Sequence, residues 1–153
     1  MDFEPPEEVP RLMNELVNWT NNCLYPEELG RKGRRKYEVH PFLVATFFHL
    51  RFIRIHPFGD GNGRMARICT NLILMLSGYM PLIVQQEDKQ EYYRALNQSN
   101  TDDINPLAHF LGEALVRSLE LMLRGAQGES IEEQEDWQKQ AERLSREVEG
   151  KKE

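Results

Sequence analysis

The sequence lacks a hydrophobic run long enough to cross a membrane, and its first residues have neither the basic nor the apolar part of a signal peptide. Cysteine is scarce, and the spacing of Cys23 and Cys69 suits neither a metal site nor a redox pair. Basic residues are not in excess, because 25 Asp and Glu outnumber 19 Lys and Arg. These absences argue against a membrane protein, a disulfide scaffold and a general nucleic-acid binder, and they make a cytoplasmic location the default expectation.

Apolar residues recur at helical spacing along most of the chain, so the sequence predicts an all-α fold. With 153 residues, the chain is long enough for one domain with its own core. We expect that compact helical core over residues 1–124 and a charged, helical tail over 125–153. The expected helices span about 9–20, 41–55, 64–77, 88–98 and 105–122.

The segment from Pro41 to Ile55 is apolar on nearly every side, which predicts the central helix of the domain. His49 lies within it and is expected to be a hydrogen-bonded core or boundary histidine rather than a ligand. In the last helix we expect one regular stripe to face the core, formed by Leu107, Phe110, Leu111, Ala114, Leu115, Leu119 and Met122.

The sequence also makes predictions for three segments that connect the helices. Asn21, Asn22, Pro26 and Gly30 should end the first helix and lead into a polar loop. That loop holds a basic cluster, which we interpret as a solvated insertion in preference to an anionic partner site: Arg31, Lys32, Arg34, Arg35 and Lys36. Gly78 is expected just past the end of the third helix, and 81–84 is a short apolar connector without a partner run for a sheet.

The segment His56–Arg67, with the sequence HPFGDGNGRMAR, combines the residue types that polyphosphate chemistry needs. Small residues at Gly61–Gly63, placed just before a helix, predict an anion-binding nest of backbone N–H groups. Arg64 and Arg67 are three apart and so share one helix face near that nest. Two guanidinium groups beside a nest suit a polyphosphate better than a lone carboxylate.

Two further residues of this segment add reactive groups. His56 supplies a general base at neutral pH, and Asp60 supplies a hard oxygen ligand that could hold Mg²⁺ together with phosphate oxygens and water. Phe58 is expected to anchor the loop in the core. The segment is not a Walker A loop, because no Gly-Lys-Ser/Thr follows, and not a Rossmann fingerprint, because no strand precedes it. One His and one Asp cannot complete a structural zinc site.

The same segment resembles the signature of the Fic family, HxFx[DE]GNGRxxR, at every fixed position. The similarity extends over about residues 5–122. Within the family the chain looks closest to the metazoan-type Fic domain and its bacterial relatives, through the stretches IHPFGDGNGRMAR, NLILMLSGYMPLIV and EYYRALNQSN. This resemblance implies a compact Fic-type helical bundle with an anion-binding loop between two central helices.

The resemblance also implies an activity. Family members are mainly protein adenylyltransferases, which move AMP from ATP to a Ser, Thr or Tyr hydroxyl of a target protein. His56 would remove the proton from that hydroxyl, and Asp60 would hold Mg²⁺ at the phosphates.

Further site residues follow from the same resemblance. The Gly61–Gly63 amides and Asn62 would stabilise charge on the phosphate oxygens, while Arg64 and Arg67 would hold the β- and γ-phosphates. Four further residues match positions that line the adenosine pocket of similar proteins: Tyr92, Tyr93, Leu96 and Asn100. The alternative is that these side chains pack in the hydrophobic core.

The sequence departs from the family pattern in two places. A target-docking β-hairpin normally precedes the segment seen here at Glu4–Pro6, so the chain is either a piece of a longer protein or a member without the hairpin. An inhibitory motif, [ST]xxx[ED][GN], is absent upstream but is matched by Ser145–Gly150. Glu149 could therefore be an inhibitory acid, although we favour a chance match in a Glu-rich tail.

Alternatives to AMP transfer remain open at this point. Some family members transfer another phosphate-containing group or remove AMP, and Gly63 argues against the kinase-like branch, which has Lys there. A different class of function is a non-catalytic or inhibited nucleotide-binding, toxin-type module, against which the intact His56 argues. The expected partners are ATP and a protein that presents a hydroxyl, with no nucleic acid and no membrane. A homodimer is compatible with exposed helix faces, although no interface stands out.

Overall fold

The computed structural model describes residues 3–25 and 39–128, and within them the chain is helical with no strand, which confirms the predicted all-α class. A short 3₁₀ helix, Pro6–Glu8, leads into helix α1. The five α-helices are α1 (Val9–Leu24), α2 (Pro41–Ile55), α3 (Asn62–Leu76), α4 (Lys89–Gln98) and α5 (Asn105–Ala126). The chain divides into two compact units, Met1–Ser118 and Leu119–Glu153.

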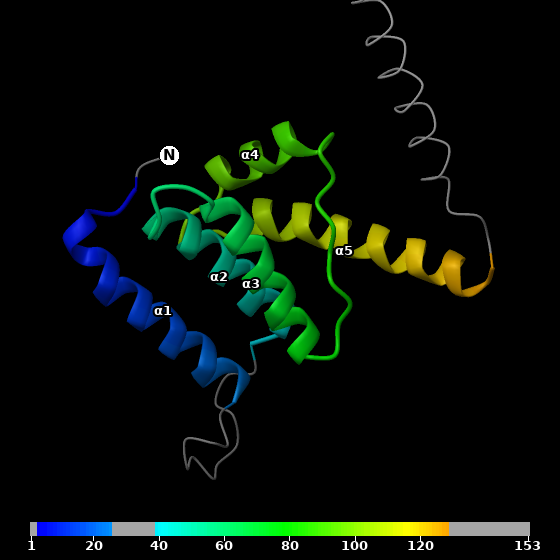
Figure 1. Ribbon diagram of the computed structural model, residues 1–153, viewed down its shortest axis with the longest axis horizontal. Coiled ribbons are helices and arrows are strands. Elements are labelled where there is room, and N and C mark those ends of the chain that lie inside the picture. The colour runs from blue at the N-terminus through cyan, green and yellow to red at the C-terminus, as the bar shows by residue number, and fades with distance from the viewer. Residues whose placement is uncertain (1–2, 26–38, 129–153) are drawn as a thin grey trace, which may run out of the picture. The chain divides into compact units, whose positions relative to one another are not determined.

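Helix α2 is the central element of the first unit, as its sequence predicts. Helices α2 and α3 lie side by side, and α1 packs on α2 (Figure 1). Nine residues of α2 are buried, because apolar side chains occur on nearly every side of the helix: Val44, Ala45, Thr46, Phe48, His49, Leu50, Phe52, Ile53 and Ile55. None of the described helices is both long and apolar enough to span a lipid bilayer.

Helix α1 is longer than predicted, because it continues through Asn21 and Asn22 to Leu24. Asparagine opposes a helix only weakly, so these two residues do not end it. The helix ends just before Pro26, because proline lacks an N–H and clashes with a helical residue before it. Trp19 packs its ring on Phe47 of α2, with centroids 4.5 Å apart. This contact holds the C-terminal half of α1 against the central helix.

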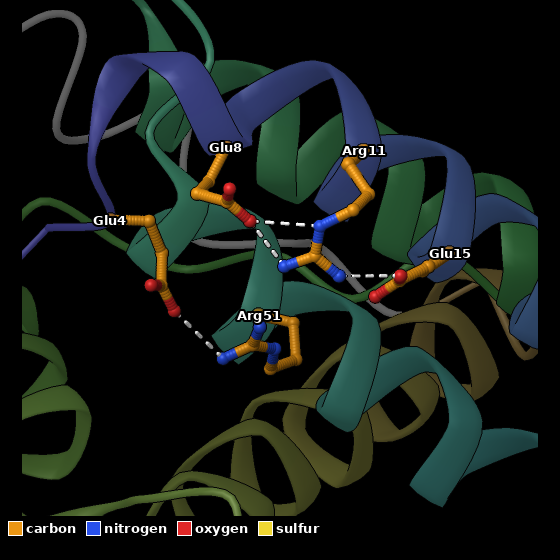
Figure 2. Close-up of polar contacts among 5 residues, drawn as sticks. All are labelled: Glu4, Glu8, Arg11, Glu15 and Arg51. Carbon is orange, nitrogen blue, oxygen red and sulfur yellow. Dashed lines mark hydrogen bonds and ion pairs between the residues drawn. The ribbon is translucent and has the colours of Figure 1, made fainter.

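The segment before α1 is attached to α2 by polar contacts. The backbone N–H of Glu4 donates to the carbonyl of Arg54, and the Glu4 carboxylate lies 3.3 Å from the Arg51 guanidinium. Figure 2 shows this pair beside a separate exposed group in which Arg11 contacts Glu8 and Glu15. The Glu4–Arg51 pair joins different parts of the chain, so it positions the first described residues over the end of α2.

The turn after α3 follows the predicted pattern. Gly78 has φ of 84°, its N–H donates to the Met75 carbonyl, and the Tyr79 N–H donates to the Leu74 carbonyl, which together form a Schellman motif. The apolar connector that follows is not a strand. Its Leu82 is buried, and the side-chain amide of Asn71 bonds both the N–H and the carbonyl of Leu82, at 2.9 and 3.0 Å.

Helix α5 differs from expectation toward its end. Its residues from Leu107 to Leu115 on the predicted stripe are buried, but Leu119 and Met122 are 44% and 50% exposed. Periodicity alone cannot tell how far a core extends, and the unit that contains this core ends at Ser118. The described part of the second unit, 119–128, is the end of α5 and the following turn. The basic cluster at 31–36, the tail beyond 128 and Glu149 lie outside the described residues.

Candidate functional site

A cleft of about 420 Å³ lies at the junction between α2 and α3 and is closed on one side by α4. It brings together residues from three separate stretches of the chain, at residue 3, 53–67 and 92–97. Nearly all of the sequence-predicted site residues line it: His56, Asp60, Gly61, Asn62, Gly63, Arg64, Arg67, Tyr92, Tyr93 and Leu96. Phe3, Ile53, Gly59 and Asn97 complete the lining. A cleft of this size, with apolar walls and convergent polar groups, has the properties of a small-molecule site.

His56 occupies an unusual backbone position at the end of α2. It has φ of 52° and ψ of 56°, the left-handed conformation, and is the only described residue other than glycine with a positive φ. Its N–H donates to the Phe52 carbonyl, and its ring Nδ1 lies 3.3 Å from the Ile53 carbonyl. A carbonyl can only accept a hydrogen bond, so this contact favours the tautomer with a proton on Nδ1. Nε2 then carries the lone pair that a general base needs.

Phe3 lies against His56 at the edge of the cleft. The two ring centroids are 4.0 Å apart, with an angle of 37° between the planes. Phe3 itself is half exposed, and the attachment of Glu4 to α2 is what places it there. The aromatic ring therefore restricts the imidazole from the side of the N-terminal segment.

The start of α3 has the geometry of an anion-binding nest. Gly61 is the N-cap, with φ of 83° and no side-chain cap, and its carbonyl accepts from the N–H of Met65. The N–H groups of the first helical turn, beginning with Asn62 and Gly63, have no intrahelical partners and carry the positive end of the helix dipole. The predicted nest thus lies in the lining of the cleft.

The side chain of Asn62 has a different place from the one expected for it. Its Oδ1 accepts from the N–H of Phe58 at 3.1 Å, and its Nδ2 donates to the Phe58 carbonyl at 2.6 Å. With 3% exposure, the amide is committed to closing the loop, and its role is to hold the nest in shape. The expected anchoring by Phe58 is found only in part: its ring lies 6.2 Å from that of the buried Phe52, but the residue is 48% exposed, and the backbone clamp also holds the loop.

Asp60, Arg64 and Arg67 are the charged residues that line the cleft. Asp60 Oδ2 accepts from Arg64 Nη2 at 3.0 Å, and both side chains are largely exposed, so this ion pair is readily exchanged for a ligand. Arg67 is half-buried and lies deeper, near Gly63 and Tyr92. The two guanidinium groups thus differ in depth, with Arg67 the more firmly surrounded of the two.

No group of three or more His, Cys, Asp and Glu side chains in the described ranges, 3–25 and 39–128, is arranged to hold a metal ion. Asp60 offers a single carboxylate at the cleft. Such a sparse donor set does not suit a dedicated protein cage for zinc or calcium. It fits Mg²⁺, which takes most of its ligands from phosphate oxygens and water.

The predicted adenosine wall is partly core. Tyr92 and Leu96 are 4% and 1% exposed, whereas Tyr93 is 52% exposed and reaches the cleft from α4. Asn100 is not among the lining residues, because its Oδ1 accepts from the N–H groups of Asp102 and Asp103 and so shapes the turn after α4. Asn97 lines the cleft in its place.

Four lining residues were not among the predicted site residues: Phe3, Ile53, Gly59 and Asn97. Asn97 lies one helical turn after Tyr93, so the helical period could have indicated it once Tyr93 was assigned to the cleft. Phe3 carries no such signal, since it is far from His56 in the sequence and meets it only through tertiary contacts. The predicted core role of His49 is confirmed, because its ring is fully buried and hydrogen-bonded at both nitrogens.

Comparison with known proteins agrees with the local geometry. The family model described as Fic/DOC family matches residues 1–74. Among curated proteins, the chain is 34% identical over 118 residues to "Protein adenylyltransferase Fic" of Aedes aegypti and 36% identical over the same length to the protein of that name in Nematostella vectensis. Each match covers 77% of this chain but only 21% and 25% of the relative, so the chain spans about a quarter or less of these proteins.

Solved structures give the same result. A Fic domain containing signaling protein from Bacteroides thetaiotaomicron superposes with a TM-score of 0.70 at 35% identity, over 84% of this chain and 51% of that one. Fic-1 from C. elegans superposes with a TM-score of 0.62 at 32% identity, over 77% of this chain and 33% of that one. Residues 1–74 thus match the Fic family, and the curated relatives, which are similar over 77% of this chain, carry the name protein adenylyltransferase.

Proposed function

We propose that this chain catalyses the transfer of AMP from ATP to a hydroxyl side chain of a protein. The observation that carries the proposal is the position of His56, which lines the same cleft as the N-terminus of α3 and two arginines. Its Nδ1 contact with Ile53 leaves Nε2 as the proton acceptor. The names of the relatives that are 34% and 36% identical to this chain over 118 residues support the same activity.

In the proposed reaction, the target hydroxyl loses its proton to Nε2 of His56 while its oxygen attacks the α-phosphorus of ATP. A new P–O bond forms to the target, the bond to the bridging oxygen breaks, and pyrophosphate leaves. Backbone N–H groups at Gly61–Gly63 stabilise the negative charge on the phosphate oxygens, and their fixed orientation makes this stabilisation available without reorganisation.

The remaining polar groups of the cleft bind the nucleotide. Arg64 and Arg67 hold the β- and γ-phosphates, and Tyr93, Leu96 and Asn97 form the wall for the nucleoside. Asp60 is the residue that would hold Mg²⁺, which when bound neutralises charge on the polyphosphate. Asn62 contributes its backbone N–H, because its side chain is committed to Phe58.

Intact-mass spectrometry after incubation with ATP and Mg²⁺ tests the proposal without knowledge of the target, because self-modification reports transfer. We expect the wild-type chain to gain the mass of one or more AMP groups and the His56→Ala variant to gain none. ATP binding by the variant, measured by titration, serves as the control for folding. A gain of phosphate alone would indicate phosphotransfer instead, and equal AMP gain in both proteins would refute the role of His56.

The match of Ser145–Gly150 to the inhibitory motif raises the question of whether Glu149 inhibits the proposed activity. If Glu149 restrains the reaction, Glu149→Gly should increase the AMP mass gain, and an unchanged gain would leave the Ser145–Gly150 match a coincidence. The neighbouring Glu147→Gly variant provides a matched control, since it removes the same charge from the same segment.

A further inference from the structure

His49 links three helices beneath the floor of the cleft. It is fully buried in α2, with its Nδ1 2.8 Å from Thr70 Oγ1 of α3 and its Nε2 2.8 Å from the Tyr92 hydroxyl of α4. Tyr92 lines the cleft, but His49 and Thr70 do not. A histidine with both nitrogens bonded has one defined tautomer, and the neighbouring groups determine which it is.

The direction of each hydrogen bond follows from Thr70. Its hydroxyl has one proton, which it donates to the Ala66 carbonyl at 2.7 Å. Thr70 Oγ1 must therefore accept from His49, which places a proton on Nδ1 and a lone pair on Nε2. Tyr92 then donates its hydroxyl proton to Nε2. The chain of donors runs from Tyr92 through His49 and Thr70 to the backbone of α3.

The protonation states of both rings are compatible with this direction. Burial, with the Arg67 charge as a second cause, lowers the pKa of His49 to about 3, so the imidazole is neutral at physiological pH. Burial raises the pKa of Tyr92 to about 12, against an opposite effect of Arg67, so the hydroxyl keeps the proton that it donates. Arg67 and Tyr92 line the same cleft, and the Arg67 side chain lowers the pKa of Tyr92 through its charge and a hydrogen bond.

The arrangement leaves the lone pairs of the Tyr92 hydroxyl free to accept from Arg67. A guanidinium can only donate hydrogen bonds. It can therefore bond a tyrosine oxygen only through a lone pair, with the hydroxyl proton pointing elsewhere. The bond to His49 uses the Tyr92 proton, so only lone pairs of that oxygen are left for Arg67. Arg67 also lines the cleft, near Gly63 of the nest.

We propose that His49 and Tyr92 are positioning residues for Arg67: His49 orients the Tyr92 hydroxyl, and the hydroxyl oxygen holds the guanidinium where it meets the terminal phosphates of ATP. This inference rests on the proposed function, in which the cleft binds ATP. It adds a role for two buried side chains, one of which makes no contact with the cleft. Neither acts on the reacting atoms, so their effect passes through Arg67.

The first test compares the affinities for ATP and AMP by calorimetric titration. Tyr92→Phe removes the hydroxyl and keeps the ring, so we expect ATP affinity to fall about tenfold and AMP affinity to change less than about twofold. AMP lacks the phosphates that Arg67 holds, so a general disturbance of the nucleoside wall would lower both affinities equally. Thr46→Val is the matched control, since Thr46 is a fully buried residue whose hydroxyl donates to the Phe42 carbonyl and which is not among the lining residues.

The second test is a double-mutant cycle. In an Arg67→Gln background, Tyr92→Phe should cause no further loss of ATP affinity, because the group that it positions is gone. Additive losses would overturn the inference. His49→Leu should reproduce the ATP-specific loss, and an unchanged ATP affinity in that variant would overturn the role of His49. A wild-type chain that binds ATP no better than AMP would refute the proposed polyphosphate site itself, a result distinct from these failures.

Discussion

The side-chain amide of Asn62 bonds both backbone groups of Phe58, at 3.1 and 2.6 Å, and so closes the loop between α2 and α3 into a ring. The clamp explains how a loop with two glycines, Gly59 and Gly61, keeps one shape. It also explains why Phe58 need not be buried. The geometry of the nest therefore depends on one amide that does not itself face a ligand.

Asn62→Ala is expected to lower both stability and ATP affinity. Two partly buried hydrogen bonds are lost and the Phe58 backbone groups lose their partners, which should reduce the free energy of unfolding by about 2–3 kcal/mol. Urea unfolding and ATP titration measure the two effects. Asn71→Ala is the control, because Asn71 clamps Leu82 in the same way away from the cleft. It should match the stability loss and leave ATP affinity unchanged; a parallel loss of affinity would contradict the role given to Asn62.

Gly61→Ala is expected to impair the nest through the backbone. Gly61 has φ of 83°, where a side chain costs about 1–2 kcal/mol, and an added Cβ would lie 3.4 Å from Arg64 Nη2. Gly78→Ala is matched, since Gly78 has φ of 84° and open space around it. Thermal unfolding should show similar losses for both variants, while ATP titration should show weaker binding only for Gly61→Ala. Equal ATP affinities would remove Gly61 from the site.

The stability of the fold should fall as acid protonates the unfolded chain. The pKa of His49 is lowered from 6.5 to about 3 by burial and by Arg67, so between these values the unfolded state binds a proton that the native state does not. The contribution to stability is present above pH 6.5 and is lost toward pH 3, at up to about 1.4 kcal/mol per pH unit.

Urea unfolding of wild type and His49→Gln at several pH values isolates this contribution from that of the carboxylates. We expect the free energy of unfolding of the wild type to fall more steeply below pH 6.5 than that of the variant. Parallel curves would show that His49 does not titrate differently in the folded and unfolded states.

Arg51→Gln should slow the reaction without contacting the nucleotide. Its partly buried pair with Glu4 fixes the segment that places Phe3 on His56, so its loss should reduce the rate of AMP transfer about twofold to fivefold. Arg11→Gln is the control, because Arg11 pairs with the exposed carboxylates of Glu8 and Glu15 on its own helical segment (Figure 2). Equal rates for wild type and Arg51→Gln in the mass assay would show that Phe3 needs no such support.

The local sequence was enough to predict the helical class, the central position of α2 and the clustering of polar groups between His56 and Arg67. These features depend on short-range patterns: helical periodicity, glycine and proline positions, and twelve consecutive residues that fold into one loop and one helix turn. Because α2 and α3 are adjacent in the chain, most of the cleft follows from their packing. The role of Gly78 as a helix terminator was predictable for the same reason.

Contacts between distant residues were decided by packing alone. The ring of Phe3 on His56, the bonds of His49 to Thr70 and Tyr92, and the choice of Asn97 over Asn100 depend on how helices and turns meet in three dimensions. The commitment of Asn62 to Phe58 is local, yet an amide can bond backbone or ligand equally well, and only the folded loop selects between them. Side-chain chemistry thus specifies which groups can serve the site, whereas packing specifies which of them face the cleft.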